Sequence, residues 1–217
     1  MNRVVWFAGF LAWGVVGWVP GSAEAVILIN EVLADPPAIF GDANGDGVIS
    51  TTQDEFVELV NAGPDSISLA QWTLSDLVQV RHVFSAAASI PAYGFFVVFG
   101  GGAPSGFANA ATTSTGSLGL NNSGDTVTLR DALAVPVDLF TYGAAGGQDV
   151  SLTRYPDVGG PFVQHSSVTN FAFSPGTTVD GLTVLPHDSA DPPTIPEPSS
   201  LLMLGVGLFG LARPRRK

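Results

Sequence analysis

Oxygen-bearing side chains alternate along a short stretch of the chain near residue 45. Asp42, Asn44 and Asp46 stand at every second position, and Gly47 follows them directly. Side chains with this spacing can converge on one point if the glycine lets the backbone turn sharply. Carboxylate and amide oxygens are the ligands that a hard cation such as Ca²⁺ prefers. The stretch therefore indicates a calcium-binding loop.

Residue types from 42 to 50 match the first nine positions of an EF-hand-type loop, and this match suggests further ligands. Val48 can offer its carbonyl oxygen, and Ser50 can bind directly or through water. The twelfth position, a bidentate glutamate in such loops, is Gln53 here, so we expect Asp54 to close the site from a shifted register. We expect a structural Ca²⁺ ion with a Kd of about 10⁻⁴–10⁻³ M. The alternative is a solvated turn, which Asn-Gly and Asp-Gly also favour.

Two glutamates lie inside apolar runs. Glu31 has the parity of the apolar residues at positions 27, 29 and 33, and Glu58 has that of positions 56 and 60. Since alternate residues of a strand face the same side, both carboxylates are expected on buried faces. A buried carboxylate needs hydrogen-bonding or cationic partners, and we expect Arg154 or loop backbone amides to supply them. A catalytic carboxylate pair is the alternative, and no other feature of the sequence supports it.

Residue types typical of catalysis are scarce. The chain has no cysteine and three histidines, His82, His165 and His187, none at the spacing of a zinc site. His82 shares a face with apolar neighbours, which favours a packed histidine over a ligand. We therefore predict no catalytic residue and a protein that is not an enzyme. The alternative is a secreted hydrolase of glycans or phosphoesters, because a glycosidase needs only two acids about 5–10 Å apart.

Short apolar runs must position these side chains. They are separated by Gly, Pro, Asn and Asp, without an amphipathic helix between them, and this pattern predicts an all-β sandwich or barrel. The stretch 100–116 is small and polar and is expected to be a long surface loop. The expected strands are 26–33, 55–61, 72–75, 78–84, 93–99, 125–130, 135–142 and 151–155.

Acidic residues dominate the body of the chain. Residues 26–198 contain 18 acids and three arginines, a net charge of −15. Such a surface repels phosphate backbones, so nucleic-acid binding is excluded as a role, whereas divalent cations are attracted. Without cysteine the domain holds together without disulfides, although export would permit them.

The first 25 residues have the order of a secretory signal peptide. Arg3 gives a positive start, residues 4–19 are apolar and uncharged, and Ala23 and Ala25 form the small-residue site that signal peptidase cleaves. A membrane anchor is the alternative, but the apolar run is shorter than the roughly 20 residues of a comfortable span. We expect the exported chain to begin at Val26.

A proline-bracketed motif, an apolar run and a basic end form the last part of the chain. Pro196, Glu197 and Pro198 precede the apolar run 201–212, and three arginines and a lysine follow it. Residues 199–212 would span only about 21 Å as a helix, against a hydrocarbon thickness of about 30 Å. A permanent tail anchor is therefore the less favoured alternative.

This tail resembles the PEP-CTERM sorting signal of bacteria. The resemblance implies cleavage near the Pro-Glu-Pro element by an exosortase-like membrane protease. It also implies transient insertion into the inner membrane through the tail, and an association with exopolysaccharide systems.

Several short blocks of the body resemble the lamin tail domain, in that family's order and over about residues 27–177. The resemblance implies an immunoglobulin-like β-sandwich that binds or scaffolds. The blocks are 29–32 (INEV), 54–61 (DEFVELVN), 72–76 (WTLSD), 124–129 (GDTVTL), 138–143 (DLFTYG), 151–154 (SLTR) and 173–177 (FSPGT).

Together these features predict four segments. We expect a signal peptide at 1–25, a lamin-tail-like β-sandwich at 26–178, a Pro/Asp-rich linker at 179–195 and the sorting signal at 196–217, with hydrophobic targeting helices at both ends. The expected protein is a non-enzymatic component of the cell surface or extracellular matrix. Its sandwich would be a calcium-stabilised module that binds extracellular polysaccharide or another surface protein. A matrix protein without a specific ligand is a further alternative.

Overall fold

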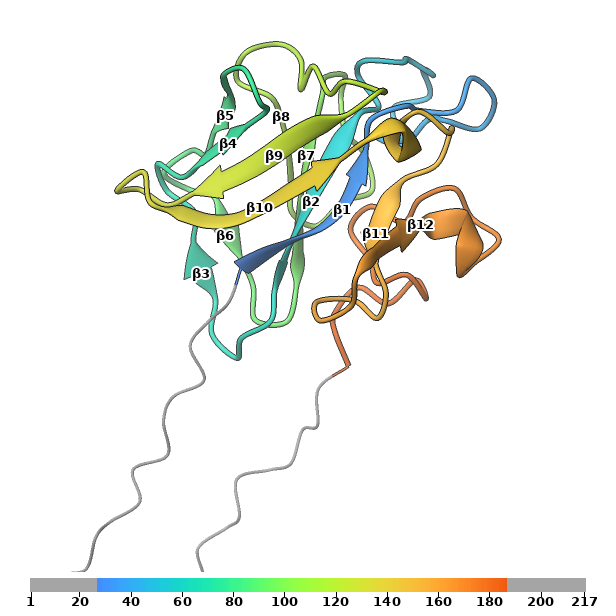
Figure 1. Cartoon of the computed structure of the whole chain (residues 1–217). Helices are drawn as coiled ribbons and strands as arrows, with labels where there is room; N and C mark the ends of the chain where they lie inside the picture. Colours follow the sequence, from blue (N-terminus) through green and yellow to red (C-terminus); the bar gives the residue numbers. More distant parts are fainter. Residues whose placement is uncertain (1–26, 187–217) are drawn as a thin grey trace, which may run out of the picture. The chain divides into compact units, whose positions relative to one another are not determined.

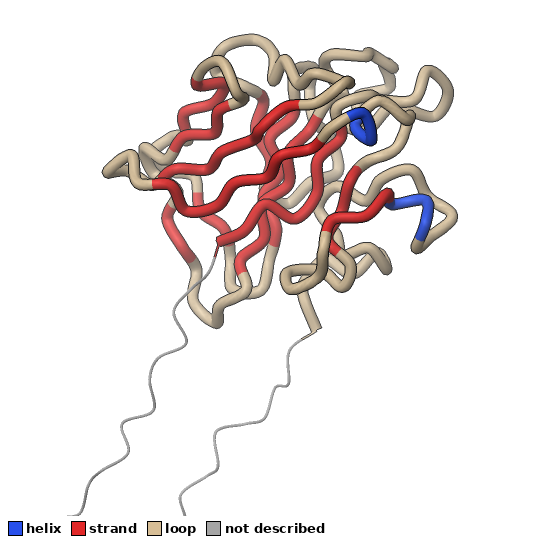
Figure 2. The backbone as a smooth tube through the Cα atoms, viewed as in Figure 1, coloured by secondary structure: helices blue, strands red, loops and turns tan. Residues whose placement is uncertain are grey.

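The computed structural model describes residues 27–186, which form 12 strands in two larger sheets and one small one (Figure 1). Strands account for most of the regular structure, and the helical turns are two short 3-10 segments, η1 Ala144–Gly146 and η2 His165–Ser167 (Figure 2). The strands are β1 Ile27–Leu33, β2 Phe56–Asn61, β3 Ile67–Ser68, β4 Thr73–Ser75, β5 Val80–Val83, β6 Ser89–Ile90, β7 Phe95–Phe99, β8 Ala110–Thr112, β9 Asp125–Arg130, β10 Pro136–Tyr142, β11 Leu152–Arg154 and β12 Phe162–Gln164.

Several expected features lie outside the described residues. These are the signal peptide with Ala23 and Ala25, the linker from 187 onward, and the sorting tail with Pro196, Glu197 and Pro198. The expected targeting helices lie outside them as well. Within the described part of the chain, no helix is long and apolar enough to cross a membrane.

Two sheets face each other across the main core. The larger has the order β12-β11-β1-β2-β7-β8, and the smaller has the order β10-β9-β4-β5; β3 and β6 form a separate pair. Neighbouring strands are antiparallel, except that β7 and β8 run parallel. The core between the sheets combines Ile29, Leu59 and Phe96 of the larger sheet with Leu74 and Leu129 of the smaller. The expected all-β sandwich is confirmed.

The larger sheet is covered on its second face too, because loops pack against it. Phe56, Val97 and Phe99 form a second apolar cluster there, against which Phe173 and Phe107 pack. This double cover explains why every residue of β7 is buried, as its apolar sequence on both parities predicts.

Residues 165–185, which follow β12, pack against that face and are called the C-terminal arm below. Val179 and Leu185 are buried, and the Leu185 N–H donates to the Tyr93 carbonyl at 2.8 Å. The compact unit continues to Leu185. The packed chain thus extends past residue 178, where the sequence placed the start of the linker.

The stretch 100–116 is only partly the surface loop that its composition predicts. It contains β8, whose register pairs Val97 with Ala110 and Phe99 with Thr112. An Ala-Ala-Thr strand lacks the apolar alternation that identifies strands in a sequence, and Thr112 is its one β-branched residue. Its conformation follows from pairing with the edge of β7, which is a tertiary effect.

Candidate functional site

The loop from Asp42 to Asp54 joins β1 to β2 and is held closed by Asp54. Its two carboxylate oxygens accept the Asn44 N–H at 3.0 Å and the Ser50 N–H at 2.7 Å. Asp54 is completely buried, and desolvation raises the pKa of this carboxyl above its ordinary value. Both oxygens of the expected closing ligand are thus bonded to the loop backbone in this structure.

The first two expected ligands converge, as their spacing predicts. Asp42 Oδ1 and Asn44 Oδ1 both accept the Asp46 N–H, at 3.1 and 3.0 Å. Asp46 Oδ1 accepts the Val48 N–H at 2.9 Å, and Gly47 takes a positive φ of 86°. Within residues 27–186 no group of three His, Cys, Asp or Glu side chains is arranged to hold a metal ion. A calcium site here would therefore depend on the Asn44 amide and on backbone oxygens as well as on acids.

A second segment, residues 101–105, closes over this loop. Asn44 Nδ2 donates to the Gly101 carbonyl at 3.3 Å, and the Ala103 N–H donates to Asp46 Oδ2 at 3.0 Å. A Cβ on Gly102 would lie 2.4 Å from both the Asn44 amide nitrogen and Asp46 Oδ2, so only glycine fits. Sequence reasoning missed this segment, although the three consecutive glycines at 100–102 were a visible signal of close backbone approach.

Glu31 and Glu58 form a buried carboxylate pair under the C-terminal arm. They are directly opposite in the β1–β2 register, and both are completely buried. Glu31 accepts hydrogen bonds from Ser151 Oγ at 2.5 Å and the Ser174 N–H at 3.0 Å. Glu58 accepts them from Asn30 Nδ2 at 2.9 Å and the Gly176 N–H at 2.6 Å. Burial was predicted correctly, and loop amides are among the partners as expected.

One detail of that prediction, the face of Glu31, is wrong, and of its two alternative partners only the loop amides are found. The β1–β2 register shifts between Ile29 and Glu31. Because of this irregularity, Glu31 and Ile29 face opposite sides of the sheet, although they are two residues apart. Glu31 therefore faces the arm, whereas Ile29 faces the core between the sheets. Arg154 is not a partner of either glutamate: its Nε donates to the Ile29 carbonyl at 2.8 Å, and its guanidinium pairs with Asp138 at 3.4 Å.

Ser174 links the carboxylate pair to a buried histidine. Ser174 Oγ lies 2.8 Å from Glu31 Oε2 and 2.9 Å from His165 Nε2. The other ring nitrogen of His165 lies 3.0 Å from the Phe171 carbonyl and 2.9 Å from Thr169 Oγ1. Ser174 also lines a hollow of about 550 Å³ in the arm. Sequence reasoning assigned His165 no role, although the partners of its ring, Thr169, Phe171 and Ser174, follow within nine residues. The link from Ser174 to Glu31, which is distant in the chain, could not be seen in the sequence.

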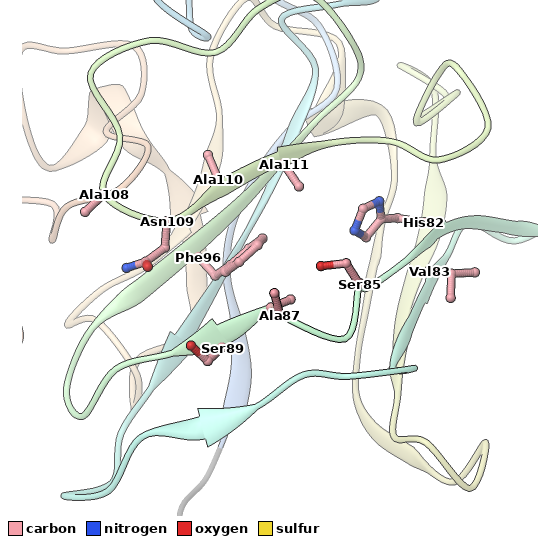
Figure 3. Close-up of a pocket in the computed structure, with 11 residues that line it drawn as sticks. His82, Val83, Ser85, Ala87, Ser89, Phe96, Ala108, Asn109, Ala110 and Ala111 are labelled. Carbon is pink, nitrogen blue, oxygen red and sulfur yellow. The ribbon is translucent and has the colours of Figure 1, made fainter.

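An uncharged hollow of about 320 Å³, called the edge cleft below, opens between β5 and β8, the edge strands of the two larger sheets (Figure 3). His82 and Ser85 lie on one side of it, and the Phe96 ring faces them from β7. His82 is buried and packs edge-on against Phe84 with centroids 4.6 Å apart, as a packed histidine should. The residues that line the edge cleft are His82, Val83, Ser85, Ala87, Ala88, Ser89, Phe96, Ala108, Asn109, Ala110 and Ala111.

The environment of His82 in this cleft favours the uncharged form of its imidazole ring. Burial lowers the pKa of His82, and a hydrogen bond to the Thr112 backbone opposes this shift only in part. His82 Nδ1 has no hydrogen-bond partner among the described residues. The cleft thus combines an uncharged imidazole with an aromatic ring and small apolar walls.

Comparison with known families agrees with this architecture. The Lamin Tail Domain model matches residues 20–144, more than half of the chain, and the PEP-CTERM protein-sorting motif matches residues 194–217. No curated protein matches the sequence. The sorting motif marks an exported protein directed to the cell surface. With its β-sandwich and a family match over most of that sandwich, the chain belongs to the lamin tail domain family.

Proposed function

We propose that this exported protein is a non-enzymatic binding or scaffolding module of the cell surface or extracellular matrix, stabilised by calcium. The observation that supports it best is the 42–54 loop at one end of β1 and β2 of the β-sandwich. Asp42 and Asn44 direct oxygens at the same backbone N–H, and Asp46 lies beside them under the 101–105 segment. A cation at this point would tie the 42–54 loop and the 101–105 segment together.

The burial of the carboxylate pair supports the non-enzymatic part of the proposal. Glycoside hydrolysis needs two acids that reach the substrate, but Glu31 and Glu58 are completely buried and bonded to neighbours. Their environment fits a structural role in holding the C-terminal arm.

A hydrolase is the second candidate, and one observation favours it. Ser174 Oγ lies at hydrogen-bonding distance from His165 Nε2, beside a hollow, as in a nucleophile and base pair. Glu31 competes for the single hydroxyl proton of Ser174, which weakens that pair. Labelling of wild-type protein, but not of Ser174→Ala, by a serine-reactive fluorophosphonate would favour the hydrolase.

Calcium can be tested on a protein of residues 26–195, because residues 27–185 form a compact unit with its own core. We expect calcium at millimolar concentration to raise its melting temperature relative to chelator. Asp46→Ala should abolish the increase, whereas Asp65→Ala, at an exposed acid outside the loop, should keep it. Identical melting curves in calcium and chelator would remove calcium from the proposal.

Binding is tested separately, with the producing cell's own extracellular polysaccharide and surface proteins as probes. Saturable binding by the 26–195 protein supports the module. The absence of binding, with calcium and without it, would leave a matrix component without a specific ligand.

Processing is the last part of the proposal. We expect signal peptidase to cleave after Ala25 and an exosortase-like protease to cleave near Glu197, after transient insertion of the tail into the inner membrane. Intact-mass analysis of the secreted protein checks both ends. Replacement of residues 196–198 by alanines should retain the protein in the inner-membrane fraction, and unchanged release would contradict an exosortase route.

A further inference from the structure

The edge cleft differs from the rest of the surface in its charge. The chain carries a net charge of −11, yet none of the residues that line the cleft is Asp, Glu, Lys or Arg. A charged ligand would lose its hydration there without gaining a counter-charge. The lining therefore suits an uncharged ligand.

Hydrogen-bonding groups are nevertheless present in the cleft. The Ser85 hydroxyl points toward the Phe96 ring (Figure 3), and it forms no hydrogen bond with another residue of the described part. The Val97 N–H donates to the Asn109 carbonyl, and the Thr113 N–H donates to the Phe99 carbonyl. Residues 109 and 113 therefore direct their backbone groups to β7. Because this direction alternates along a strand of a parallel pair, the N–H and C=O of Ala110 face away from β7.

The side of β8 that faces away from β7 borders the edge cleft. Thr112 shares the parity of Ala110, and two residues later Ser114 Oγ accepts the Val83 N–H of β5 at 3.0 Å, so the outward edge of β8 faces β5. The Ala110 main chain therefore offers one donor and one acceptor on that side, and Ser85 lines the same cleft. Phe96 and the alanines supply apolar surface. A ligand that matches these groups carries hydroxyls around a compact ring with an apolar face.

An extended peptide fits the cleft less well. Addition of a strand needs a row of free backbone groups along a sheet edge, but β8 has only three residues. The Thr112 backbone lies close enough to the buried His82 ring to affect its pKa, so this part of the edge is covered. Beyond it, Ser114 Oγ accepts the Val83 N–H at 3.0 Å and Thr115 Oγ1 donates to the Arg81 carbonyl at 2.8 Å, so that segment crosses to β5. Ala110 alone remains for pairing.

We propose that the edge cleft binds one neutral sugar unit, through the Ser85 hydroxyl and the Ala110 main chain, with the ring packed against Phe96. The inference rests on the proposed binding function, and it names the ligand class and the place. The volume of the edge cleft, about 320 Å³, is at the small end of the range for ligand pockets. This volume suits one sugar ring of a longer polysaccharide.

Alanine methyl groups provide a direct test, because five alanines line the cleft. The 26–195 protein, with ¹³C-labelled alanine methyls, is titrated with glucose, galactose, mannose and N-acetylglucosamine at millimolar concentrations, and with glucuronate as the anionic counterpart. We expect saturable shifts at Ala110 and Ala111 with at least one neutral sugar and none with glucuronate. No shift at these methyls with any neutral sugar, or equal shifts with glucuronate, would overturn the proposal.

Two matched variants locate the effect. Ala87→Trp fills the cleft, whereas Ala86→Trp adds the same side chain at an exposed neighbour that does not line it. We expect the first to abolish the sugar-induced shifts and the second to retain them, with equal melting temperatures. Ser85→Ala should weaken binding about threefold to tenfold, the loss of one neutral hydrogen bond. Persistence of binding in Ala87→Trp would place the sugar elsewhere.

The same variants separate this inference from the proposed function. If Ala87→Trp still binds the polysaccharide as wild type does, the module function stands and the edge cleft is not its site. If wild-type protein binds neither polysaccharide nor any neutral sugar, the sugar site and the binding role both fail, and a matrix component without a specific ligand remains.

Discussion

Glu31 on β1 lies directly opposite Glu58 on β2, and solvent reaches neither carboxylate. Like charges at opposed positions of a sheet destabilise it, and two carboxylates that share a site do not both ionise readily. Desolvation raises the pKa of Glu31 and, with the further effect of the Glu31 charge, raises the pKa of Glu58 well above its ordinary value. The pair persists because Ser174 and Gly176 of the arm donate to it. It therefore attaches the C-terminal arm to the sheet.

Glu58→Gln is predicted to destabilise the domain. Both carboxylate oxygens of Glu58 accept from nitrogen donors, Asn30 Nδ2 and the Gly176 N–H. An amide nitrogen cannot accept, so one buried donor loses its partner, at a cost of about 1–3 kcal/mol. Urea unfolding measures the loss, and limited proteolysis of the arm locates it. Asp65→Asn, at an exposed acid, is the control and should be neutral. Wild-type stability for Glu58→Gln would show that the pair does not hold the arm.

Stability is predicted to fall as pH rises from about 4.5 to about 7. Burial raises the pKa of Glu55 from 4.5 to about 7, so the folded state binds a proton in this window that the unfolded state has released. The folded state is favoured fully below the unfolded pKa, and this contribution, about 3 kcal/mol at most, is lost as pH passes through the folded pKa. Glu31 and Glu58 act in the same direction. Calorimetric melting from pH 4.5 to 8 measures the slope.

A matched substitution isolates the contribution of Glu55. The Gly119 and Leu120 N–H groups both donate to Glu55 Oε2, so one carbonyl oxygen of a glutamine can accept both. Glu55→Gln should therefore fold well, in contrast to Glu58→Gln, and should reduce the slope. A slope equal to that of wild type would mean that Glu55 does not titrate in this range.

The strands that the sequence identifies are those whose apolar residues alternate with polar ones or run together between turn residues. The run 125–130 coincides with β9, and the run 55–61 differs from β2 by one residue. Short strands such as β8 and β12 carry no such pattern, because their conformation comes from pairing with neighbours. Local composition predicts a strand only where that strand buries its own apolar face.

The candidate sites, too, can be predicted only where local sequence builds them. Residues 42–54 are contiguous, so their spacing shows the possible ligands directly. The carboxylate pair could be located but not its partners, because an irregularity at Asn30 reverses the parity and Ser174 lies 143 residues from Glu31. The edge cleft has no sequence signal, since His82, Phe96 and Ala110 come from three strands that meet only in the fold.

Asp54→Ala is predicted to destabilise the 42–54 loop whether or not calcium is present. Asp54 is the buried acceptor for the Asn44 and Ser50 N–H groups, and loss of an acceptor costs about 1–3 kcal/mol for each buried donor left unpaired. The melting temperature in chelator should fall well below that of wild type. Asp46→Ala should lower it less in chelator, because Asp46 is only partly buried. Equal losses in chelator for the two variants would contradict a bracing role for Asp54.

Gly100→Ala is predicted to separate the end of β7 from the loop that precedes β2. A Cβ on Gly100 would lie 1.9 Å from the Thr52 carbonyl oxygen, too close for either backbone to remain in place. Overpacking of this kind costs about 1–3 kcal/mol, and the displaced Thr52 would also disturb the neighbouring Asp54. Gly159→Ala is the matched control, since nothing lies within 4 Å of a Cβ there. Chemical denaturation of both variants should show a clear loss for Gly100→Ala and a change within about 0.5 kcal/mol for Gly159→Ala. Similar stability for the two would mean that the 50–54 and 100–105 segments are not held in contact, and the cover over the candidate calcium loop would lose its structural basis.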